Sequence, residues 1–189
     1  MESIKIYLLF TDTGSLLSKL IKLYTKKPYN HVSLAFDPEL MTVYSFGRKK
    51  ATNPFHGGFV KEDVRSGLFK DADCAIYSLT ITAEQQVKIR SIIDEMEKHK
   101  DIYRYHFLGL FGFLLSKPIS KQHAFFCSEF VATLLMECGV IYEHKPASLM
   151  SPSDLQQIPC LQLQYEGKLK DYLSTDLELD HAYQMLITE

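Results

Sequence analysis

Segments with the pattern of β-strands are concentrated in the first half of this chain, and this order constrains the fold more than any other feature of the sequence. A short Asp37-Pro38-Glu39 turn joins two of these segments, which is the pattern of a β-hairpin. Most segments with apolar residues at helical spacing follow later in the chain. We therefore predict an α+β domain in which a small antiparallel sheet packs with helices. The predicted strands are 4–10, 31–36, 41–46, 59–64, 74–81 and 161–165.

Capping residues mark where several of the predicted helices begin and end. Thr82 and Gln85 have the spacing of a capping box. Gly139 is a typical residue just past the end of a helix. Ser151 precedes a proline, which favours the first helical position. The predicted helices are 13–24, one that includes 87–96, 107–115, 127–138 and a short one that opens at 151.

The composition is that of a single domain, 1–189, and argues against several classes of protein. The chain has 189 residues, of which 46% are hydrophobic and 23% charged. Its formal net charge of −2 argues against a nucleic-acid-binding protein. The longest apolar stretch, 107–115, is far shorter than the roughly 20 residues of a membrane span, and no secretory signal is recognisable. We therefore predict a cytoplasmic protein without stable membrane insertion.

The loops and cysteines give no sign of a cofactor. Segment 47–58, rich in Gly, Asn and Pro, is predicted to be a loop, and Gly167 to lie in a turn. No glycine-rich loop has the pattern of a nucleotide site, and no histidine or cysteine spacing has that of a metal site. We therefore predict no cofactor and no metal. Cys74 and Cys138 lie on apolar faces and are predicted to be buried, whereas Cys160 has no clear role.

Cys127 is the candidate nucleophile because it begins a predicted helix. Backbone N–H groups in the first turn of a helix have no intrahelical partner, and the helix dipole there favours a thiolate. The same N–H groups could stabilise an oxyanion. Glu129, in the same turn, fits the preference for acids but slightly opposes a thiolate. An isolated cysteine is also often a small buried apolar residue, and that alternative stays open.

His31 is the candidate general base, since it opens a predicted strand and such an end is a rigid mount. A lone histidine at this place can also be purely structural. His123, four residues before Cys127, is a rival base. A base of this kind is usually oriented by a third polar group.

The order of these motifs resembles the permuted branch of the NlpC-type papain-like superfamily. The chain looks closest to the YaeF/YiiX-like permuted papain-like amidases, with lecithin retinol acyltransferase as a more distant relative. In that branch a histidine strand precedes the cysteine helix, the reverse of papain. The matching motifs are Asn30-His31-Val32-Ser33-Leu34, Val43-Tyr44-Ser45-Phe46, Tyr105-His106-Phe107-Leu108-Gly109-Leu110, Phe126-Cys127-Ser128-Glu129-Phe130-Val131 and Ser151-Pro152-Ser153-Asp154-Leu155.

The resemblance also implies an orienting residue on the second strand of the hairpin. Relatives often carry His, Glu or another polar residue there, and Ser45 falls near that position in this chain. A serine can form a hydrogen bond but cannot hold a charge. Asn53, in the following loop, is an alternative orienting residue.

These observations predict a cysteine hydrolase, an amidase or peptidase that acts through Cys127, His31 and a thioester. The expected substrate is a small molecule, a peptide or an acyl amide. One alternative is an acyltransferase or lipid-acyl hydrolase, for which 107–115 could offer an apolar surface. Another is a catalytically weak module that binds a peptide or amine, and a thiol redox sensor is a third. The sequence leaves the substrate and the oligomeric state open.

Overall fold

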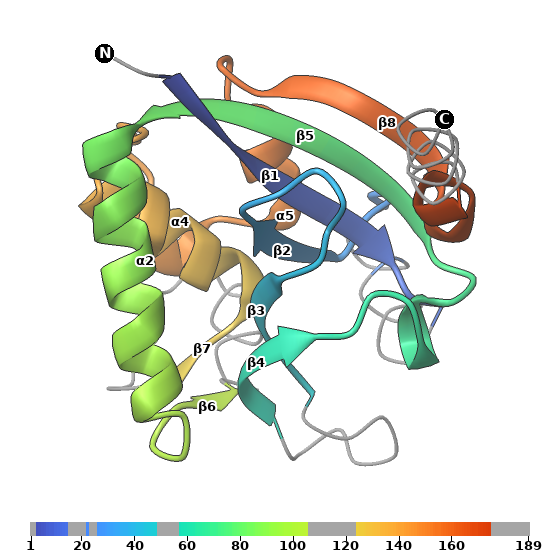
Figure 1. Ribbon diagram of the computed structural model, residues 1–189, viewed down its shortest axis with the longest axis horizontal. Helices are drawn as coiled ribbons and strands as arrows, with labels where there is room; N and C mark the ends of the chain where they lie inside the picture. The colour runs from blue at the N-terminus through green and yellow to red at the C-terminus, as the bar shows by residue number, and fades with distance from the viewer. Residues whose placement is uncertain (1–2, 15–21, 23–25, 49–56, 106–123, 175–189) are drawn as a thin grey trace, which may run out of the picture.

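The computed structural model describes residues 3–14, 22, 26–48, 57–105 and 124–174, and it confirms the α+β class. An antiparallel sheet has the strand order β4-β3-β2-β1-β5-β8 (Figure 1). Each predicted strand is present, with ends shifted by a few residues. The strands are β1 (Ser3–Asp12), β2 (His31–Ala35), β3 (Val43–Arg48), β4 (Gly57–Glu62), β5 (Asp73–Thr82) and β8 (Gln162–Lys168).

Both faces of the central strands are buried, which explains the continuous apolar run at the start of the chain. Ile6, Leu8 and Phe10 of β1 belong to a large cluster that also contains residues of the helices. Leu9 belongs to a second cluster on the other side. The helical segment 169–174 contributes Leu169 and Leu173 to that second cluster.

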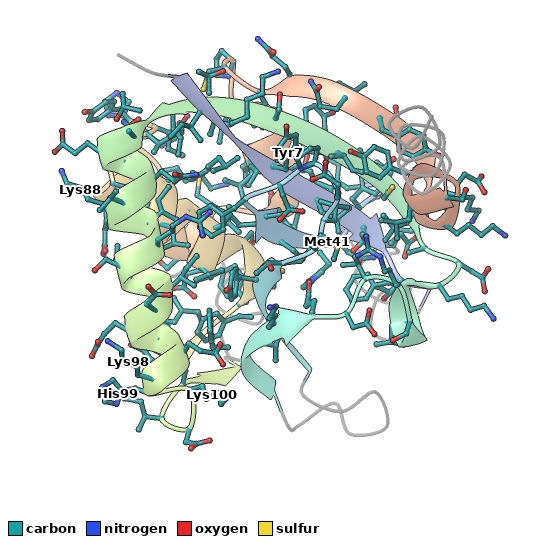
Figure 2. The ribbon with its side chains drawn as sticks, viewed as in Figure 1. Tyr7, Met41, Lys88, Lys98, His99 and Lys100 are labelled. Atoms are coloured by element: carbon teal, nitrogen blue, oxygen red, sulfur yellow. The ribbon has the colours of Figure 1, made fainter. Side chains whose placement is uncertain are left out.

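Helix α2 (Ala83–Lys98) begins with the predicted capping box. Thr82 Oγ1 accepts a hydrogen bond from Gln85 N at 3.2 Å, and Gln85 Oε1 accepts one from Thr82 N at 2.9 Å. The helix packs on β5 and β1, and its buried residues include Ile89 and Ile93. Figure 2 shows the side chains of Lys88 and Lys98 pointing away from the sheet.

Helix α4 (Cys127–Glu137) packs across β2 and β3 and against α2 (Figure 1). Its end agrees with the prediction, because Gly139 has the positive φ of 65° expected just past a helix. The 3-10 helix η2 (Ala147–Leu149) and helix α5 (Pro152–Gln156) pack against α4. No helix among the described residues is long and apolar enough to cross a membrane.

Several local predictions are corrected or fall outside the described residues. The predicted loop 47–58 is wrong at both ends, because Gly47 and Arg48 extend β3 and Gly57 and Gly58 begin β4. Gly167 lies inside β8 instead of in a turn. Sequence patterns also missed a short parallel pair, β6 (Arg104–Tyr105) and β7 (Ala124–Phe125). Of the helix predicted over 13–24, only residues 13, 14 and 22 are described; residue 22 is helical and residues 13 and 14 are not. The helix predicted over 107–115 lies outside the described residues.

Aromatic rings join the sheet to the start of α4. Phe46 of β3 is fully buried, with its ring centroid 5.1 Å from Phe125 and 5.3 Å from Phe130. Phe59 of β4 and Tyr103 lie 5.8 and 6.0 Å away. Such pairs stabilise a fold beyond their simple burial. Phe46 therefore connects strands β3 and β4 to the helix that carries Cys127.

Replacing Phe46 with alanine should destabilise the fold by about 3–5 kcal/mol, because it leaves a cavity among these rings. Met41, 66% exposed and labelled in Figure 2, offers a control in the same hairpin. We expect Met41→Ala to change the free energy of unfolding by less than about 0.5 kcal/mol. Urea denaturation measures both, and equal effects of the two substitutions would contradict this role of Phe46.

Candidate active site

His31, the first residue of β2, faces a carboxylate from the edge strand of the sheet. Its Nε2 lies 2.8 Å from Oε1 of Glu62, the last residue of β4. The His31 side chain is 16% exposed and that of Glu62 is 8% exposed. An ion pair with so little exposure is screened weakly by solvent. Glu62 therefore holds the imidazole through one of its two nitrogens.

Ser33 binds the other oxygen of the same carboxylate. Its hydroxyl donates to Glu62 Oε2 at 2.5 Å and lies 3.2 Å from His31 Nε2. Ser33 and His31 are two residues apart on β2, so their side chains share one face of the strand. The Glu62 carboxylate is thus hydrogen-bonded at both of its oxygens, through Oε1 to His31 and through Oε2 to Ser33.

Gly47 leaves the space that this carboxylate occupies. A Cβ at Gly47 would lie 3.2 Å from Glu62 Oε1 and 3.8 Å from His31 Cε1. The first distance is tighter than ordinary van der Waals contact. Because Gly47 of β3 has no side chain, the side chain of Glu62 on β4 can reach across β3 to His31 on β2.

Cys127 is the first residue of α4, and its side chain lies close enough to His31 to influence the pKa of the imidazole. Because Nε2 faces Glu62, Nδ1 is the ring nitrogen left for the thiol. Cys127 is 5% exposed. The start of its helix is anchored by Ser128, whose hydroxyl donates to the carbonyl of Met150 at 2.7 Å. The structure thus places the two residues that the sequence predicted close together.

The charges around His31 favour a protonated ring. Burial alone lowers the pKa of the imidazole. The negative charges of Glu62 and Cys127, together with hydrogen bonds to both, outweigh burial and hold the pKa well above the ordinary 6.5. The site therefore favours an imidazolium opposite the Glu62 carboxylate.

The first turn of α4 also presents backbone N–H groups near the sulfur. The first hydrogen bond within this helix runs from Phe130 N to Phe126 O. By the geometry of a helix, the N–H groups of Cys127, Ser128 and Glu129 have no carbonyl partner earlier in the helix. They are suited to stabilise negative charge that develops on an oxygen beside Cys127.

Glu129 is a buried carboxyl group in the same turn. It is 7% exposed, and its Oε2 accepts a hydrogen bond from Phe126 N at 3.4 Å. Burial raises the pKa of Glu129 to about 7, against the smaller opposing effect of that hydrogen bond. Near neutral pH the residue is therefore partly uncharged, which weakens its opposition to a thiolate at Cys127.

The structure corrects the assignment of the orienting residue. Ser45 is fully buried, and its hydroxyl donates to the carbonyl of Val32 at 3.0 Å instead of reaching the imidazole. The residue of β3 that lies beside His31 is Gly47. Asn53 and the rival base His123 lie outside the described residues.

Glu62 and Ser33 were missed by the sequence analysis, for different reasons. Ser33 had a usable signal, because alternation along a strand places it on the same face as His31. Glu62 had none, since it stands between Lys61 and Asp63 in a run of charged residues that looks like an ordinary exposed edge.

The remaining cysteines have environments unlike that of Cys127. Cys74 and Cys138 are buried as predicted, while Cys160 is exposed. Burial raises the pKa of the Cys74 thiol to about 12 and raises that of Cys138 as well. Among the described residues no group of three or more His, Cys, Asp or Glu side chains could hold a metal ion.

Comparisons of this chain with protein-family models, with curated proteins and with solved structures found no match. The geometry of the site is therefore the basis for assigning it a role. That geometry defines a buried Cys-His-Glu arrangement at the junction of a helix start and a sheet.

Replacing Glu129 with glutamine should stabilise the protein at alkaline but not at acid pH. The folded protein binds this proton more tightly than the unfolded chain does, so wild-type stability falls as the pH rises from 4.5 to about 7. Glutamine has no charge to desolvate and can still accept the hydrogen bond from Phe126. We expect equal free energies of unfolding near pH ~4 and a gain of roughly 2–3 kcal/mol for Glu129→Gln above pH ~8. Urea denaturation at both pH values measures the difference, and equal stabilities at high pH would contradict it.

Replacing Gly47 with alanine should disturb the carboxylate without unfolding β3. Because His31 and Ser33 both hold Glu62, the new methyl group can be accommodated only if the Glu62–His31 hydrogen bond lengthens. We expect a lower pKa for His31, measured by NMR titration of its Cε1 proton. An unchanged His31 pKa in a folded Gly47→Ala protein would show that the space at Gly47 is not needed.

Proposed function

We propose that this protein is a cysteine hydrolase that cleaves an amide or peptide bond through a thioester intermediate. The observation that carries the proposal is the position of His31 between the Cys127 thiol and the Glu62 carboxylate. A base that a carboxylate holds on one side and that lies close to a thiol nucleophile on the other is the arrangement that thiol catalysis needs. The resemblance to permuted papain-like amidases is consistent with it and belongs to the same proposal.

In the first step, the Cys127 sulfur attacks the carbonyl carbon of the substrate. The carbonyl electron pair moves to oxygen, and N–H groups of the first turn of α4 stabilise the oxyanion. The tetrahedral species collapses when the C–N bond breaks. His31 gives its proton to the departing amine, which leaves an acyl group bonded to sulfur.

In the second step, a water molecule attacks the thioester carbon. His31, now neutral, takes a proton from this water through the nitrogen that faces Cys127. The C–S bond breaks, the carboxylic acid departs, and the sulfur and imidazole return to their starting states. An amine or alcohol in place of water would give acyl transfer by the same steps.

Glu62 gives this mechanism a charge that Ser45 could not supply. A carboxylate opposite Nε2 stabilises the imidazolium that must form and reform during turnover. The alternative of a catalytically weak binding module drew its support from a neutral serine at this position, and that support is now removed. The alternative of lipid-acyl chemistry drew on segment 107–115, which lies outside the described residues.

The proposal is tested by trapping the acyl-enzyme. Incubation with activated acyl esters and thioesters of different chain length should add one acyl mass to the protein, located on Cys127 and released by hydroxylamine. Cys127→Ala should abolish the adduct, and His31→Ala should slow its formation by at least about a hundredfold. Steady turnover of acyl amides, with and without an added amine, then separates hydrolysis from acyl transfer.

Ser45→Ala is the matched control for this experiment, because it removes a buried hydroxyl from the neighbouring strand without touching the imidazole. It should leave the acylation rate within about twofold of the wild type. No adduct on Cys127 with any ester, or equal adduct formation in His31→Ala and wild type, would contradict the proposal.

A further inference from the structure

Among the residues that the structure describes, Ser33 is the one whose side chain lies within hydrogen-bond distance of both His31 and Glu62. The residue is fully buried, and it comes from the same strand as His31. Its Oγ lies 2.5 Å from Glu62 Oε2 and 3.2 Å from His31 Nε2. Neither the sequence motifs nor the mechanism above gives this hydroxyl a role.

The direction of these hydrogen bonds fixes where the imidazole proton lies. A serine hydroxyl has a single proton, and Ser33 donates it to Glu62 Oε2. Toward His31 Nε2 the Ser33 oxygen can therefore only accept. Glu62 Oε1 is also an acceptor at this nitrogen. When the ring is neutral, two acceptors at Nε2 hold its one proton there, which leaves Nδ1 as the basic nitrogen.

The two attachments also fix the carboxylate itself. A carboxylate bonded through one oxygen can rotate about its terminal torsion, which is a broad one. Ser33 holds the second oxygen, and its backbone is continuous with that of His31 through Val32. His31 and Ser33, the residue that holds the Glu62 carboxylate, therefore both lie on the rigid strand β2.

We propose that Ser33 is a positioning residue that acts through Glu62 and, in the neutral form of the His31 ring, holds the single proton on Nε2 so that Nδ1 is the basic nitrogen. This inference rests on the proposed thiol chemistry for its importance to turnover. The arrangement it describes, however, can be measured on the resting protein.

The test compares Ser33→Ala with Ser45→Ala in the full-length protein. Both substitutions remove one buried serine hydroxyl from adjacent strands, but only Ser33 contacts the imidazole. In Ser33→Ala we expect the His31 pKa, followed by NMR, to fall by about one unit, which is a tenfold change in the protonation equilibrium. The 15N shifts of the neutral ring should show a smaller share of the Nε2–H tautomer. Ser45→Ala should leave both unchanged.

A double-mutant cycle shows whether Ser33 acts through Glu62. In a Glu62→Gln background, Ser33→Ala should produce little further change in the His31 pKa or in the iodoacetamide rate at Cys127. If Ser33→Ala does not fold, Ser33→Cys supplies a weak donor of similar shape and should shift the pKa in the same direction. An unchanged or raised His31 pKa in the folded variant, or equal shifts from the two serines, would overturn the proposal.

These outcomes separate this inference from the proposed function. A wild-type protein that forms no acyl-enzyme but loses about one pKa unit at His31 in Ser33→Ala would retain Ser33 as a positioning residue and reject the hydrolase. A protein that turns over amides equally well in both serine variants, with the same His31 pKa, would keep the hydrolase and reject the role of Ser33.

Discussion

The hydrogen bond between His31 Nε2 and Glu62 Oε1 is the interaction on which the site depends. It places a negative charge opposite one nitrogen of a ring whose pKa the nearby Cys127 side chain also raises. Burial by itself would favour a neutral imidazole, so the charge of Glu62 is needed to overcome it. Without this carboxylate, burial would favour a neutral His31 beside Cys127.

The sheet brings these groups together because of its antiparallel order. Strands β2 and β4 both flank β3, and Gly47 on β3 has no side chain to separate His31 from Glu62. Aromatic packing around Phe46 then fixes the start of α4 against the same strands. Burying the His31–Glu62 pair costs desolvation free energy, and the strand pairing and the aromatic packing around Phe46 offset that cost.

Local signals in the sequence were sufficient for most of the fold and for half of the site. Strand alternation, the Thr82 capping box and the helix-ending Gly139 are each patterns of a few neighbouring residues. The strands and the helix ends that they mark could therefore be predicted. Cys127 and His31 were predicted because each opens an element in a recognisable motif. Glu62 depends on which strand lies next to which, and on a space at Gly47. Such pairing across strands is set by the tertiary structure and leaves no local pattern.

Site-specific alkylation tests the central claim most directly, because the protein carries its own reference thiols. Cys160 is exposed and Cys127 is buried, so exposure alone would make Cys160 react first with iodoacetamide. If His31 and Glu62 activate the sulfur, Cys127 should react faster than Cys160 at about pH 6–7, and His31→Ala should abolish that advantage. A Cys127 that reacts more slowly than Cys160 throughout this range, unaffected by His31→Ala, would contradict an activated thiolate at this site.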